Sequence, residues 1–140
     1  MRQDHSPGFG SAARFVASSV RNSGIDTESM GPDGPIKLLE IMGRNAGWLT
    51  AAAALAKETE SDPPHLIYRP ERKISREQIT GDVRATLDRF GYCVAAVSDG
   101  IVDENGEPYA MPSGKVDPCG HEVKLGVIET VAGVIEDTLR

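Results

Sequence analysis

Residues 36–58 read IKLLEIMGRNAGWLTAAAALAKE, and the interpretation of the whole chain starts from this stretch. Its first six residues, Ile36 to Ile41, are mostly apolar, which is typical of a short strand covered on both faces. The alanine-rich run from about Asn45 to Ala56 predicts a helix, because alanine is the best helix former. The stretch therefore predicts a strand, a tight turn at Met42-Gly43-Arg44, and a helix able to lie close to a sheet.

This turn lies where the carboxyl end of a strand meets the amino end of a helix, and ligands of open α/β sheets bind at that edge. Free N–H groups and the positive end of the helix favour an anion there. Arg44 adds a guanidinium group that can bind a phosphate or carboxylate through two hydrogen bonds. The pattern indicates a candidate phosphate-ester site. An ordinary strand–turn–helix with a solvated arginine has the same spacing.

The composition predicts a globular protein. The chain has 140 residues, 39% of them hydrophobic and 26% charged, which suits one domain over residues 1–140. A net charge of -6 argues against nucleic acid or an anionic membrane as the main partner. No window approaches the ~18 consecutive apolar residues of a membrane span.

The N-terminal residues and the cysteines predict a cytoplasmic location. The first five residues contain no apolar signal core. Cys93 and Cys119 have neither CxxC nor Cys/His metal spacing. We therefore expect a cytosolic protein with reduced thiols, and we expect Cys93 to be packed in the core because it lies in an apolar run.

Outward from the central stretch, apolar periodicity predicts further helices and strands. The expected helices cover residues 12–22, 76–90 and 121–139, and the expected strands cover residues 65–68 and 92–97. Gly24 should end the first helix, with a polar loop over residues 26–35. Ser75 and Gln78 form a capping box, and Gly91 should terminate the helix that follows. Residues 103–116 form a polar segment long enough for a mobile or functional loop.

The alternation of helices and strands predicts an α/β fold of three layers, with a short parallel sheet and crossover helices. In such a sheet, Met42-Gly43-Arg44, Glu71-Arg72 and Ser98-Asp99-Gly100 follow three strands and meet along one edge. Convergence of polar groups at one edge is what a binding site needs. His65 could be a ligand in principle. It stands alone at a strand start, which favours a structural role.

Several segments resemble one enzyme family. They are IMGRNAGWLTAAAALA (41–56), PHLIYRPE (64–71), DHSPGFGSAARFVA (4–17), CVAAVSDGI (93–101) and GHEVKLG (120–126). Together they resemble the 6-phosphofructokinases, most closely the branch that includes the pyrophosphate-dependent enzymes. The resemblance covers nearly the whole chain and implies a phosphofructokinase-like domain.

The resemblance also implies roles for individual residues. Met42, Gly43 and Arg44 would hold fructose 6-phosphate, with Arg44 pairing with a phosphate oxygen and the Met42-Gly43 turn shaping the sugar pocket. Glu71 would accept hydrogen bonds from sugar hydroxyls. Asp99 falls where the family often carries a glutamate, and it is a possible pocket-lining residue. The implied activity is Mg²⁺-dependent phosphorylation of fructose 6-phosphate to fructose 1,6-bisphosphate, with pyrophosphate or ATP as donor.

The sequence also departs from the family pattern. It contains neither the GGDG-type donor loop, nor the TIDND-like motif that carries the catalytic base, nor the later GxxQR-type stretch. Pro35 stands where many members supply an arginine from a neighbouring subunit. The resemblance thus implies that residues 1–140 form the central, sugar-phosphate-binding part of a longer enzyme. The Mg²⁺ site would lie outside this chain, which alone would be inactive.

Two assemblies are compatible with this expectation. The chain would work as a homo-oligomer or in association with other phosphofructokinase chains. Alternatively, it would be a non-catalytic sugar-phosphate-binding module that regulates a full-length enzyme.

Overall fold

A three-stranded parallel sheet forms the centre of the computed structural model, which describes residues 6–110, 112–116, 122–124 and 126–139. Its strands are β1 (Ile36–Ile41), β2 (Leu66–Tyr68) and β3 (Cys93–Ser98), in the spatial order β1-β3-β2. The helical elements are α1 (Phe9–Met30), the 3₁₀ helix η1 (Gly31–Asp33), α2 (Trp48–Ala51), the 3₁₀ helix η2 (Ala52–Ala56), α3 (Arg76–Phe90) and α4 (Val127–Leu139).

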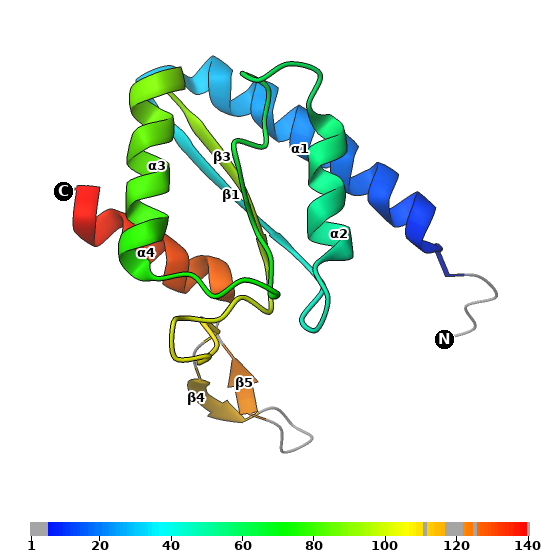
Figure 1. Ribbon diagram of the computed structural model, residues 1–140, viewed down its shortest axis with the longest axis vertical. Coiled ribbons are helices and arrows are strands. Elements are labelled where there is room, and N and C mark those ends of the chain that lie inside the picture. Colours follow the sequence, from blue (N-terminus) through cyan, green and yellow to red (C-terminus); the bar gives the residue numbers. More distant parts are fainter. Residues whose placement is uncertain (1–5, 111, 117–121, 125, 140) are drawn as a thin grey trace.

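The helices cover both faces of this sheet (Figure 1). On one face, Cys93, Ala95 and Val97 of β3 pack with buried side chains of α3 and α4. On the other face, Ala96 packs with Val20 of α1 and with the alanines of η2. All six residues of β3 are buried, as expected for the central strand of a parallel sheet. The predicted three-layer α/β fold is confirmed.

The two crossover connections have the same hand. From β1 the chain passes through α2 and η2 to β2, and it then returns through α3 to β3 in the middle of the sheet. The first crossover lies on the α1 face and the second lies on the α4 face. Because both the direction across the sheet and the face are reversed, the handedness is unchanged, in keeping with the general rule for parallel strands.

Helix α1 is longer than the sequence indicates. Gly24 does not end it, and most of the expected loop over residues 26–35 is helical. Gly24 is buried against Pro63, and the flanking Val20 and Thr27 are also buried. The packing of this face outweighs the cost of about 1 kcal/mol for a glycine inside a helix. The helix ends instead at Gly31, which has a φ of 59°.

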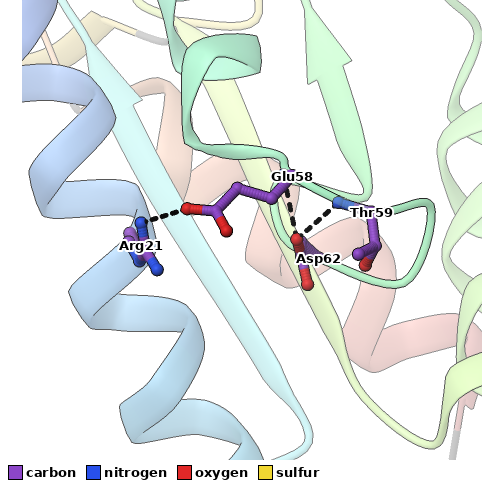
Figure 2. Close-up of polar contacts among 4 residues, drawn as sticks. All are labelled: Arg21, Glu58, Thr59 and Asp62. Atoms are coloured by element: carbon purple, nitrogen blue, oxygen red, sulfur yellow. Dashed lines mark hydrogen bonds and ion pairs between the residues drawn. The ribbon is translucent and has the colours of Figure 1, made fainter.

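The loop between η2 and β2 is fastened to α1 by polar contacts (Figure 2). Arg21 Nη1 lies 2.6 Å from Glu58 Oε1. Asp62 Oδ2 accepts hydrogen bonds from the N–H groups of Thr59 (2.6 Å) and Glu58 (2.9 Å), and these bonds lower the pKa of its carboxyl. These contacts hold the loop that brings Pro63 onto α1.

Helix α3 begins and ends as predicted. Ser75 Oγ accepts a hydrogen bond from the Gln78 N–H at 3.1 Å, so Ser75 is the N-cap. Gly91 follows the last turn in the left-handed conformation, with a φ of 80°, and its N–H donates to the Leu87 carbonyl. Ile79 and Val83 of this helix are fully buried in the core.

The carboxyl-terminal part differs from the prediction. The expected helix start near His121 is wrong, because Glu122–Lys124 form strand β5, which pairs antiparallel with β4 (Pro112–Val116). His121 itself and Cys119 lie outside the described residues. The polar segment after Asp103 is also more ordered than expected: Tyr109 is buried and donates a hydrogen bond from its hydroxyl to the Ile74 carbonyl at 2.9 Å.

Helix α4 is attached to β1 at its first turn. Glu40 Oε2 accepts a hydrogen bond from the Ile128 N–H at 3.0 Å, which satisfies a free helical donor. Within the described ranges, no helix is both long and apolar enough to cross a bilayer.

Candidate functional site

The three strands end at one edge of the sheet, as the sequence predicts. Ile41 lies opposite Ser98 in the register of β1 and β3, and Tyr68 lies opposite Val97 in the register of β2 and β3. The residues that follow each strand are therefore neighbours in space. This edge brings together the turn after β1, the Glu71 segment after β2 and the Ser98-Asp99-Gly100 segment at the end of β3.

Gly43 is held through both of its backbone polar groups. Its N–H donates to Asp99 Oδ1 at 2.9 Å, and its carbonyl accepts from the Ser98 hydroxyl at 3.1 Å and the Ala46 N–H at 3.2 Å. Gly43 has a φ of 149°, and a Cβ there would lie 2.7 Å from the Ala46 carbonyl oxygen. Glycine is therefore required by both backbone conformation and space.

Glu71 fastens the other end of the same turn. Its Oε1 accepts a hydrogen bond from the Gly47 N–H at 2.7 Å, and Gly47 is the N-cap residue of α2. That hydrogen bond lowers the pKa of the Glu71 carboxyl, so the group is ionised at neutral pH. Arg69 also lies beside Gly47, because a Cβ on Gly47 would come within 2.9 Å of Arg69 Cβ.

The expected helix N-terminus is not available to an anion as the sequence suggested. Residues 43–47 form the turn, so α2 begins at Trp48 rather than Asn45 and has only four residues before it tightens into η2. The Gly47 N–H is already bound to Glu71. The positive group that remains for an anion is the Arg44 side chain, which is exposed and has no recorded hydrogen bond or ion pair within the part of the chain that the structure describes.

Backbone contact between two strand ends places Arg44. A Cβ on Gly100 would lie 2.5 Å from Arg44 Cα and 2.6 Å from its carbonyl carbon. The Gly100 backbone, just after β3, therefore packs directly against the Arg44 backbone. Met42, two residues before Arg44, is 72% exposed, and Trp48 after the turn is 74% exposed.

The site thus combines an exposed guanidinium with two strand-end carboxylates. A guanidinium pairs well with a phosphate, and carboxylate oxygens accept hydrogen bonds from hydroxyl groups. Such a set suits an anionic polyol. Among the described residues, no three His, Cys, Asp or Glu side chains cluster closely enough to hold a metal ion.

Sequence reasoning placed Met42, Gly43, Arg44 and Glu71 at this edge but missed what Ser98 and Asp99 do. Both are bound to Gly43 rather than directed only at a pocket. The available signal was a fully apolar strand followed at once by Ser-Asp-Gly, since short polar side chains at strand ends commonly bind nearby backbone groups.

His65 is a structural residue rather than part of this site. Its Nδ1 accepts a hydrogen bond from the Val94 N–H at 3.0 Å, and its ring lies between those of Phe90 and Tyr92, with centroids 5.0 and 4.8 Å away. Burial, with a smaller contribution from the Lys57 charge, lowers the pKa of this imidazole. Protonation would place an N–H against the Val94 N–H.

We expect this arrangement to make stability depend on pH. The unfolded chain binds a proton at His65 below about pH 6.5, whereas the folded chain resists it. Stability is therefore complete above that pH and falls as the pH drops toward the lowered folded pKa. Urea unfolding between pH 7.5 and about pH 5 measures the loss. In His65→Asn, which keeps an acceptor and does not titrate, the loss should be smaller; an identical loss in both proteins contradicts the prediction.

Comparisons with known proteins bear on this geometry. A family model described as "Phosphofructokinase" matches residues 1–139. A pyrophosphate–fructose 6-phosphate 1-phosphotransferase from Halomonas elongata is 42% identical over 137 residues, which are 97% of this chain and 32% of that protein. A sulfofructose kinase from Alkalicoccus urumqiensis is 46% identical over 102 residues, which are 73% of this chain and 26% of that protein.

A solved structure has the same fold. A pyrophosphate-dependent phosphofructokinase from Nitrosospira multiformis superposes with a TM-score of 0.75 at 31% identity, covering 95% of this chain and 30% of that one. The chain spans about a third of the length of the curated relatives it matches.

Proposed function

Because the chain belongs to the phosphofructokinase family, we propose that it forms the fructose 6-phosphate-binding part of a pyrophosphate-dependent phosphofructokinase. The observation that carries this proposal is the exposed Arg44 guanidinium on a turn held between two strand-end carboxylates. In this proposal residues 1–140 form a single partial phosphofructokinase domain.

Each site residue has a separate role. Arg44 binds the 6-phosphate through its guanidinium. The Met42-Gly43 turn shapes the sugar pocket, and the fixed Gly43 peptide keeps that turn in place. Glu71 uses one oxygen to hold Gly47, and its other oxygen accepts a hydrogen bond from a sugar hydroxyl.

The reaction of the complete enzyme is transfer of a phosphoryl group from pyrophosphate to fructose 6-phosphate. Such transfer depends on positioning of both substrates, on charge neutralisation and on a base that orients the attacking hydroxyl. This chain supplies the acceptor side. The metal, the donor loop and the base lie on other parts of the enzyme, and the chain alone leaves the reaction incomplete.

The experiment is a calorimetric titration of the folded chain with fructose 6-phosphate. We expect saturable binding that is lost in Arg44→Ala and only partly kept in Arg44→Lys, because lysine retains the charge without the two-pronged geometry. Circular dichroism establishes that all three proteins are folded. With pyrophosphate and Mg²⁺ present, the wild-type chain should form no fructose 1,6-bisphosphate.

Two results would overturn the proposal. Equal binding by wild type and Arg44→Ala would remove Arg44 from the site. Preference for sulfofructose, the sugar in the name of one relative, would replace a phosphate by a sulfonate as the anion and change the substrate.

We further propose that the chain associates with phosphofructokinase chains, either copies of itself or full-length enzyme that it regulates, and that it does so in the cytoplasm. Within the described ranges, β1 pairs with β3 alone, which leaves its outer side as a free edge. A groove of about 330 Å³ beside that edge is lined mainly by apolar side chains of α1, β1 and α2, including Phe15, which is 73% exposed. Such an apolar surface supports contact with another chain.

A further inference from the structure

Three consecutive residues at the carboxyl end of β3, Ser98, Asp99 and Gly100, contact the turn that carries Arg44. The Asp99 N–H donates to the Ile41 carbonyl at 3.1 Å, so residue 99 continues the backbone pairing of β3 with β1. The Asp99 side chain accepts a hydrogen bond from the Gly43 N–H, with Oδ1 2.9 Å from the Gly43 nitrogen. Asp99 therefore links the last backbone hydrogen bond between β3 and β1 to the turn that follows β1.

Ser98 holds the following peptide group, which joins Gly43 to Arg44. Its hydroxyl donates to the Gly43 carbonyl at 3.1 Å and accepts from the Gly100 N–H at 3.2 Å, which leaves the hydroxyl no alternative orientation. The Gly43 N–H belongs to the Met42–Gly43 peptide and its carbonyl belongs to the Gly43–Arg44 peptide, so both peptide groups that flank Gly43 are held. Arg44 is the next residue, so the course of its backbone follows from the orientation of these two peptides.

The acceptor on Asp99 is suited to fastening rather than to substrate contact. A carboxylate aimed at a phosphate would repel it, whereas a carboxylate bound to an N–H donor forms a strong charge-assisted hydrogen bond. Asp99 is also partly buried, while Arg44 is exposed. The geometry therefore gives Asp99, at the end of β3, the role of holding the turn, and leaves Arg44, after β1, free to contact a ligand.

We propose that Asp99 is a positioning residue of the sugar-phosphate site, acting through the Gly43 peptide on Arg44 rather than on the sugar. The identity of the ligand rests on the proposed function above. The role of Asp99 in holding Gly43 is independent of that function, because the hydrogen bonds are present in the protein without a ligand. Glu71 provides a built-in comparison, since it holds Gly47 of the same turn from a different strand.

The first test uses NMR to measure the rate of amide hydrogen exchange at Gly43 and Gly47, in the absence of any ligand. Asp99→Ala should speed exchange at Gly43 by about tenfold or more and leave Gly47 unchanged. Glu71→Ala should do the reverse. Asp99→Asn keeps a side-chain oxygen acceptor and should restore most of the protection at Gly43. Unchanged exchange at Gly43 in Asp99→Ala overturns the proposal, as does equal acceleration at both amides, which would mean general loosening.

The second test is fructose 6-phosphate affinity of the same variants. Asp99→Ala should bind about tenfold more weakly although Arg44 is intact, and Asp99→Asn should recover. If Asp99→Asn protects the Gly43 amide yet binds as weakly as Asp99→Ala, the carboxylate charge acts on the sugar directly and the positioning role is wrong. If the wild-type chain does not bind fructose 6-phosphate, the proposed function fails, while the exchange pattern still decides the role of Asp99.

Discussion

Gly100→Ala should lose most of its affinity for fructose 6-phosphate, because the new methyl group would overlap the Arg44 backbone. A Cβ on Gly100 would lie 2.5 Å from Arg44 Cα and 2.6 Å from its carbonyl carbon, and it would overlap the carbonyl oxygen. These are backbone atoms, so no side-chain rotation relieves the contact. The turn must move away from β3, and forced shifts of this kind cost about 1–3 kcal/mol.

Titration calorimetry and urea unfolding measure the two consequences. We expect affinity to fall by about tenfold or more and the unfolding midpoint to fall with it. Gly10→Ala is the matched control, since a Cβ on Gly10 meets nothing within 4 Å. It should bind as wild type does and be no less stable, since alanine suits a helix better than glycine. A Gly100→Ala protein with wild-type affinity would mean that the Arg44 position does not depend on the end of β3.

Gly24→Ala should destabilise the chain although the substitution normally strengthens a helix. A Cβ on Gly24 would overlap Pro63 Cγ and lie 3.1 and 3.2 Å from its Cβ and Cδ. The rigid proline ring belongs to the loop fastened by Asp62 and Glu58 in Figure 2. The overlap should cost about 1–3 kcal/mol, more than the gain of about 1 kcal/mol from helix propensity.

Gly81→Ala in α3 is the matched comparison for this prediction. Gly81 is exposed, and a Cβ there meets nothing within 4 Å. The substitution should raise the free energy of unfolding by about 0.5–1 kcal/mol. Urea unfolding of both variants gives the comparison, and stabilisation by both substitutions would refute the packing between α1 and the Pro63 loop.

The sheet and the α3 caps were predictable because their signals are local. The bounds of β1, the Ser75 cap and the Gly91 terminus all depend on residues within a few positions of one another. The length of α1 was not predictable, because Gly24 is a helix breaker in isolation and is accommodated only through a buried contact with Pro63. The β4–β5 hairpin was missed because apolar spacing over residues 121–139 resembles one continuous helix.

That Arg44, Glu71 and Asp99 meet at one edge was predictable, but their contacts were not. Parallel strands bring their carboxyl ends together, so Arg44, Glu71 and Asp99 could be assigned to one edge from the strand pattern alone. The bonds from Gly43 to Asp99 and from Gly47 to Glu71 join residues 56 and 24 positions apart. They depend on the path of the turn, which no local pattern of side chains determines.

The turn that carries Arg44 does not hold its conformation by itself. Its two ends are hydrogen-bonded to residues at the ends of two other strands. Binding of any ligand at this turn would therefore be thermodynamically linked to folding, since the turn keeps this conformation only while the whole sheet is assembled. A sugar phosphate bound at this turn would act as a stabiliser of the entire domain. Conversely, any substitution that loosens the sheet, however far from Arg44, would reduce the fraction of molecules able to bind.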